Sequence, residues 1–267
     1  MITFVRTGRT AGVIARTIMT AATALLAIST LVAPASAATY YFKPGHPTFF
    51  GGPGTGSYCT GGYAIRGSSG MFILTDGHCA GVGSSVYGTS RKFGTVAYSR
   101  WTTYDTALIQ EVAGDDALQI VVDPLTGNSP GNGKIVGIYP KSSLGVGTLI
   151  GKMGQTTGWT EGTITGTITW HGMTAYCSHA YTWAGDSGGP VWRTGGGGVL
   201  AVGITVAYYE SSGDGCFIAI QDLLNEWGAW LPVFSSAAAL ESPAKAAPVP
   251  PMQSSEIPLP AVGHLHR

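Results

Sequence analysis

The sequence predicts an all-β fold, and three patterns support this. Between residues 38 and 233 the chain reads as short strand-like runs separated by turns rich in Gly, Ser, Pro and Asn. The run Thr163–Trp170 alternates polar and apolar residues with period two, as in a strand with one buried face. Val199–Val206 is a nearly continuous apolar run, which is typical of a fully buried strand.

One short helix is expected near the end of this region, where five apolar residues fall on one face at helical spacing: Leu223, Leu224, Trp227, Trp230 and Leu231. We interpret it as a packing helix. After Phe234 the composition shifts to Ala, Pro and Ser. Such a segment buries too little apolar surface to fold, so residues 234–267 are predicted to be a disordered tail.

The amino terminus has the pattern of a signal peptide. Three arginines precede a largely apolar run from Thr17 to Val32, which is followed by the small-x-small sequence Ala35–Ala37. We expect residues 1–37 to be removed by cleavage after Ala37 and the protein to be secreted. The alternative is an uncleaved membrane anchor, but the run is short of the roughly 20 apolar residues that span a bilayer. No stable membrane insertion is therefore expected.

The charge balance argues against a nucleic-acid partner. The whole chain has 14 basic and 14 acidic residues, and loss of the three arginines before Ala37 leaves 11 basic residues against 14. Phosphate binding depends on clustered Lys and Arg, and the sequence contains no such cluster.

Four cysteines remain in the predicted mature chain: Cys59, Cys79, Cys177 and Cys216. An even number in an exported chain favours disulfides, and three pairings are open. The alternative is a zinc site built from His78-Cys79 and Cys177-Ser178-His179. Structural zinc usually shows short paired spacings of Cys or His and commonly occurs in reducing compartments, which argues against this alternative in an exported chain.

The segment Gly185–Pro190 predicts a nucleophilic serine, because it reads as a tight turn that presents the Ser187 hydroxyl beside free backbone donors. Such a serine needs a base and a group that orients the base. His78 follows the strand-like run Met71–Leu74 and can accept a proton near neutral pH. Asp105 opens another strand-like run and can hold the second imidazole nitrogen in one tautomer.

The order His, Asp, Ser resembles that of the chymotrypsin-like serine proteases, and most closely the secreted bacterial branch typified by the streptogrisins. Two further segments carry the resemblance, Cys59–Arg66 ahead of the histidine and the Thr-Thr-Gly motif within Gly154–Gly162. The resemblance extends from about Cys59 to Trp230. It implies a protease domain at residues 38–233 made of two six-stranded antiparallel β-barrels. The Pro, Gly and Asn content of residues 123–133 is typical of a connection between them.

The resemblance also implies the site residues. His78, Asp105 and Ser187 would form the catalytic triad, and the N–H groups of Gly185 and Ser187 would form the oxyanion hole. It selects the disulfides Cys59–Cys79 and Cys177–Cys216. Lys152 occupies the place of the basic residue that pairs with the aspartate before the serine, so we expect an internal Lys152–Asp186 ion pair. The alternative is a solvated surface lysine.

The substrate pocket is predicted from four residues: Tyr181, Trp183, Val206 and Tyr208. No carboxylate occurs between Met173 and Ala184, which argues against a demand for Lys or Arg. Tyr181 and Trp183 favour apolar or small side chains, although simple barrel packing explains them equally well. Val206 replaces a serine that the family places near the catalytic aspartate, and Tyr208 replaces a glycine where substrate would lie.

The expected function is therefore a secreted serine endopeptidase, active as a monomer on polypeptides and open to proteinaceous protease inhibitors. Its chemistry requires no metal and no organic cofactor. Two other functions remain open: a secreted binding or adhesion protein that reuses the fold, and an esterase that uses the same serine.

Overall fold

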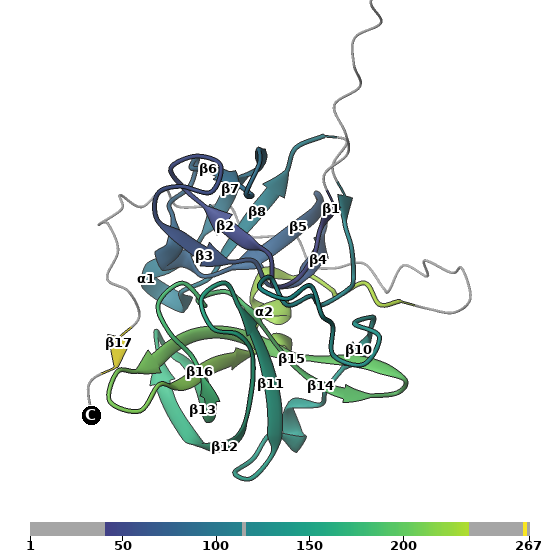
Figure 1. The fold of residues 1–267 in the computed structure, drawn as a ribbon, viewed down its shortest axis with the longest axis vertical. Helices are drawn as coiled ribbons and strands as arrows, with labels where there is room; N and C mark the ends of the chain where they lie inside the picture. Colours follow the sequence, from purple (N-terminus) through teal and green to yellow (C-terminus); the bar gives the residue numbers. More distant parts are fainter. Residues whose placement is uncertain (1–40, 114–115, 235–263, 266–267) are drawn as a thin grey trace, which may run out of the picture. The chain divides into compact units, whose positions relative to one another are not determined.

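The computed structural model describes residues 41–113, 116–234 and 264–265 (Figure 1). The predicted signal peptide at residues 1–37 lies outside the described residues, as does most of the predicted tail at 234–267. Almost all of the described chain is strand and turn, which confirms the all-β prediction. No helix within the described residues is long and apolar enough to cross a membrane.

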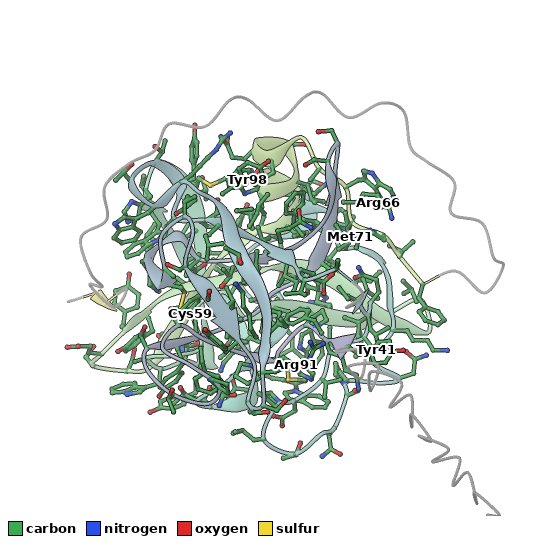
Figure 2. The ribbon with its side chains drawn as sticks, turned by 90° about the horizontal axis from the view of Figure 1, so that it is seen from above. Tyr41, Cys59, Arg66, Met71, Arg91 and Tyr98 are labelled. Carbon is green, nitrogen blue, oxygen red and sulfur yellow. A yellow bond between two sulfur atoms is a disulfide. The ribbon has the colours of Figure 1, made fainter. Side chains whose placement is uncertain are left out.

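The first sheet has seven antiparallel strands in the order β3-β2-β6-β7-β8-β5-β4. They are β2 (Pro47–Phe49), β3 (Tyr58–Thr60), β4 (Ala64–Gly67), β5 (Gly70–Thr75), β6 (Ser85–Tyr87), β7 (Lys92–Ser99) and β8 (Ala107–Glu111). Arg66 of β4 faces Met71 of β5 in the register, and both are labelled in Figure 2. Seven apolar side chains fill the interior: Phe42, Ile73, Val86, Phe93, Val96, Ala107 and Ile109.

This first sheet is a half-barrel, because no ladder joins its end strands β3 and β4. The two strands are halves of one segment that bends at residues 61–63. At the bend the Gly61 N–H donates to the His46 carbonyl, and the Gly62 N–H donates to the Leu74 carbonyl. A Cβ on Gly62 would lie 2.7 Å from the Gly188 carbonyl oxygen. The predicted first barrel is therefore a half-barrel, and the Ser187 segment lies close to its bend at Gly62.

The second sheet closes into the predicted six-stranded barrel, because β15 pairs with both β14 and β16. Its strands are β11 (Leu149–Gly154), β12 (Gly158–Trp170), β13 (Met173–Tyr181), β14 (Pro190–Gly195), β15 (Gly198–Tyr209) and β16 (Asp214–Ala219). Burial alternates along most of β12, and nearly all of β15 is buried, as the sequence predicted.

Three shorter parallel pairings are also present: two extend the second sheet, and the third is a separate two-stranded sheet. β10 (Ile135–Ile138) runs parallel to β15 of the second sheet, and in the separate sheet β1 (Tyr41–Phe42) runs parallel to β9 (Asp116–Ala117). Within the predicted tail, β17 (His264–Leu265) runs parallel to Tyr208 and Tyr209 of β15.

The predicted helix is α2 (Ile220–Trp227), and it is shorter than the apolar pattern implied. It ends at Gly228, which adopts a left-handed conformation with φ 55°. Trp230 therefore lies beyond the helix, in a bridge with Arg66. The Trp227 indole N–H donates to the Thr106 hydroxyl, 3.1 Å away, so α2 connects the second barrel to the first. The remaining helical turns are η1 (Gly77–Cys79), α1 (Trp101–Tyr104) and η2 (Lys141–Ser143).

Candidate active site

The predicted nucleophile lies in the loop between β13 and β14. Ser187 is buried except for 7% of its surface. Gly185, two residues earlier, has φ 97°, and a Cβ there would lie 2.3 Å from the Tyr58 ring and 2.5 Å from Thr156 Oγ1. Only glycine fits this position, because a side chain would meet both strain and collision.

The loop presents two backbone donors. The Thr156 hydroxyl donates to the Ala184 carbonyl at 2.5 Å, and in a trans peptide the following N–H, that of Gly185, points the opposite way. Among the described residues, neither the Gly185 N–H nor the Ser187 N–H has a protein acceptor. The two groups are therefore available to an oxygen that carries developing negative charge.

The Asp186 carboxylate holds the loop in place through hydrogen bonds. Its Oδ1 accepts the N–H groups of Thr156 and Thr157, and its Oδ2 accepts the Trp183 N–H and the Thr157 hydroxyl. Lys152 Nζ lies 2.7 Å from Oδ2, and both side chains are buried. Burial lowers the pKa of Lys152, and the negative charge of Asp186 opposes that shift. The predicted ion pair between Lys152 and Asp186 is therefore present in the structure, and both oxygens of the carboxylate also accept hydrogen bonds from the surrounding loop.

His78 and Asp105 form a buried pair in two connections of the half-barrel, His78 in η1 after β5 and Asp105 between α1 and β8. Asp105 follows α1 with φ 50°, a left-handed conformation that aspartate tolerates. Its Oδ1 accepts the backbone N–H of His78 at 2.9 Å, and His78 Nδ1 lies 3.0 Å from Oδ1 and 2.9 Å from Oδ2. The Trp101 ring contacts the imidazole edge to face, with centroids 5.6 Å apart. The imidazole is therefore held by its Nδ1, which leaves Nε2 for chemistry.

A cavity of about 220 Å³ is lined by residues from both halves of the site. Its walls include His78 from the first sheet and Gly185 and Ser187 from the nucleophile loop; the other residues are Gly56, Ser57, Tyr58, Cys59, Cys79 and Ala184. Cys59, which is labelled in Figure 2, is joined to Cys79 by a disulfide. No hydrogen bond joins the Ser187 and His78 side chains in this structure. Such bonds are often long without substrate and tighten when it binds.

The second disulfide joins Cys177 of β13 to Cys216 of β16. The two disulfides together contain all four cysteines of the predicted mature chain, and their pairing is the one that the resemblance implied. The zinc alternative is therefore wrong, because it required free thiolates at Cys79 and Cys177.

The four predicted pocket residues differ in their surroundings. Trp183 and Tyr181 are partly exposed and their rings stack, with centroids 6.3 Å apart. Tyr208 is buried and contacts Trp183, with ring centroids 5.0 Å apart. Val206 is fully buried and packs in a hydrophobic cluster that includes residues of both sheets. Val206 is therefore a core residue, whereas the three aromatic residues form one continuous cluster beside the loop.

Two residues near His78 were not identified from the sequence. Trp170, at the end of β12, donates its indole N–H to Asp105 Oδ2 at 2.9 Å. Asp76 is fully buried, and its Oδ2 lies 4.0 Å from His78 Nδ1. Burial, followed by the nearby charge of Asp105, raises the pKa of Asp76 well above its usual range. Asp76 could have been noticed as a carboxylate two residues before the histidine, but no local signal links Trp170 to Asp105.

The closed barrel, the half-barrel and the cavity that joins His78 to Ser187 define a chymotrypsin-like fold. No protein-family model matches the chain, and no curated protein does. Among solved structures, Thermobifida fusca Protease A is similar, with 27% identity, a TM-score of 0.58, and coverage of 73% of this chain and 100% of that one.

Two further structures show the same fold. Nocardiopsis protease is 23% identical, with a TM-score of 0.58 and coverage of 72% of this chain and 100% of that one. Cellulomonas bogoriensis chymotrypsin is 24% identical, with a TM-score of 0.57 and coverage of 73% and 100%. The structural neighbours are bacterial chymotrypsin-like serine proteases, which confirms the resemblance and supports a serine-type endopeptidase.

Proposed function

We propose that the protein is a secreted serine endopeptidase whose triad is Ser187, His78 and Asp105. One observation carries this proposal. His78, which is paired with the buried Asp105, and Ser187 line one cavity, beside two backbone N–H groups that have no protein acceptor among the described residues. Nucleophile, base, orienting group and oxyanion donors are the parts that acyl transfer requires.

The reaction follows from these positions. Ser187 Oγ attacks the peptide carbonyl carbon while His78 Nε2 accepts its proton. The N–H groups of Gly185 and Ser187 donate to the resulting oxyanion, and His78 returns the proton to the leaving amine. Water then attacks the acyl-enzyme with His78 as the base, which releases the acid and regenerates Ser187. Asp105 holds the imidazole in place throughout by accepting a hydrogen bond from Nδ1.

The proposed preference is for apolar or small residues on the acyl side of the cleaved bond. The aromatic cluster of Tyr181, Trp183 and Tyr208 supports this, because aromatic rings offer apolar contact surface to a substrate side chain. Secretion is supported by the two disulfides, which form in oxidising compartments. Cleavage after Ala37 remains part of the proposal.

Peptide-library digestion tests this function. We expect amide bonds to be cut, mainly after apolar or small residues, with Ser187→Ala as the control that abolishes cleavage. Turnover of simple esters without amides would replace the endopeptidase with an esterase. Predominant cuts after Lys or Arg would refute the proposed preference, and a folded protein without any turnover would favour a binding function.

A further inference from the structure

We propose that Trp170 is a positioning residue of the active site, which holds the Asp105 carboxylate in place for His78. This inference rests on the proposed function and extends it to a residue of the second barrel. The key contact is the hydrogen bond of 2.9 Å from Trp170 Nε1 to Asp105 Oδ2. Asp105 lies just before β8 of the first sheet, so this bond joins the two halves of the molecule.

Asp105 needs this donor because it is fully buried. A buried carboxylate is costly unless its oxygens accept hydrogen bonds. Oδ1 receives the backbone N–H of His78, whereas Oδ2 receives only His78 Nδ1 and the Trp170 indole among the described residues. Without the indole, Oδ2 keeps only the bond to the imidazole that it must orient.

The side chain that the resemblance would expect in this role is missing. Val206 stands where the related proteases have a serine near the aspartate, and it is buried among apolar residues. An isopropyl group cannot donate a hydrogen bond. The indole of Trp170 supplies a donor from another strand, and an indole N–H is a donor only, so it always favours the charged carboxylate.

The tip of the β12–β13 hairpin is built to bring Trp170 to this place. Trp170 is the last residue of β12 and pairs with Met173, the first residue of β13. The turn between them contains His171 with φ 44°. The His171 ring lies against Trp170 at 5.0 Å and against Trp101 at 4.8 Å between centroids.

Trp101 in turn contacts the imidazole of His78. The hairpin tip is therefore packed against the same aromatic group that borders the proposed base. This packing fixes the indole in position, so that little freedom is lost when its N–H binds the carboxylate.

Trp170→Phe tests the role, since it removes the N–H and keeps an aromatic ring. We expect kcat on a peptide amide to fall about 10- to 100-fold, the usual range for losing a hydrogen bond to a charged group, with KM changed less than about twofold. Trp159→Phe is the matched control. Trp159 lies on the same strand, and its indole donates to the exposed Glu161 side chain, so its loss should leave kcat within about twofold.

A kcat of Trp170→Phe within twofold of the parent, or an equal fall in Trp159→Phe, would overturn the inference while leaving the endopeptidase intact. An inactive parent protein would instead reject the proposed function, and the role of Trp170 with it. If Trp170→Phe does not fold, the test is made on the native protein by following the assigned NMR resonance of the Trp170 indole N–H. That resonance should shift when a fluorophosphonate reacts with Ser187, and an unchanged resonance would refute the contact with the reacting system.

Discussion

Two carboxyl groups lie beside His78, and their surroundings differ. Asp105 accepts N–H groups from His78 and Trp170, whereas neither oxygen of Asp76 has a protein hydrogen-bond partner among the described residues. Burial raises the pKa of Asp76, and the charge of Asp105 raises it further. The two environments therefore differ: the oxygens of Asp105 accept N–H groups, whereas burial and the nearby charge favour the neutral form of Asp76.

The unfolding free energy of Asp76→Asn, relative to that of the parent protein, should therefore increase as the pH rises. A carboxyl whose pKa is raised by folding contributes most stability below its unfolded-state pKa, near 3.8, and loses it as the pH rises toward the folded-state value. The variant lacks this loss, so its advantage in unfolding free energy should grow by up to about 1.4 kcal/mol per pH unit in that interval. Urea denaturation of both proteins between pH 4 and pH 8 measures the difference. Parallel pH profiles would contradict the raised pKa.

Sequence reasoning identified the residues whose signals are local. Gly185, Asp186 and Ser187 stand in one short motif, and the collision of any side chain at Gly185 with Tyr58 and Thr156 explains why that motif is glycine-rich. Trp170 was missed because it reaches Asp105 only through the three-dimensional path of a hairpin 65 residues away. The alternating pattern of Thr163–Trp170 predicted the strand β12 correctly, but it carried no information about the contact between Trp170 and Asp105 at the tip of the hairpin.

At the scale of elements, the Lys152–Asp186 pair joins β11 to the nucleophile loop. Lys152→Ala should lower the unfolding free energy by about 3–5 kcal/mol, because it leaves a buried carboxylate without its counter-ion. It should also slow the reaction of Ser187, since the loop presents the oxyanion donors. Chemical denaturation and the rate of fluorophosphonate labelling measure the two effects.

Lys141→Ala is the control for that experiment. Lys141 pairs with Asp222 at 2.7 Å, but the lysine side chain is 40% exposed. Exposed pairs contribute about 0–1 kcal/mol, so this variant should be nearly as stable as the parent and label at the same rate. Equal stability of the two lysine variants would show that the Lys152 pair does not anchor the loop.

Among the elements, regular strands were the most predictable. The period-two pattern of Thr163–Trp170 and the apolar run of Val199–Val206 both became strands of the closed barrel. The helix was predicted too long, because the apolar spacing continues past Gly228 while the backbone does not. The gap in the first sheet had no sequence signal beyond two adjacent glycines, and the Ser187 loop approaches one of them, Gly62, closely.

For the whole molecule, the fold matters because it places each half of the site on a different sheet. His78 and Asp105 come from the half-barrel, and Ser187, Lys152 and Trp170 come from the closed barrel or its loops. Several hydrogen bonds join the halves near the site, and three illustrate them. The Thr60 N–H donates to the Ser187 carbonyl at 2.8 Å, Trp170 donates to Asp105, and Trp227 donates to Thr106.

The central claim is that Ser187 is a reactive nucleophile activated by His78. Intact-protein mass spectrometry after treatment with a fluorophosphonate tests it most directly. We predict one covalent adduct per chain, located on Ser187, and none in folded Ser187→Ala or in folded His78→Ala over the same time. A folded parent protein that gains no adduct, or an adduct that persists in Ser187→Ala, would contradict the claim.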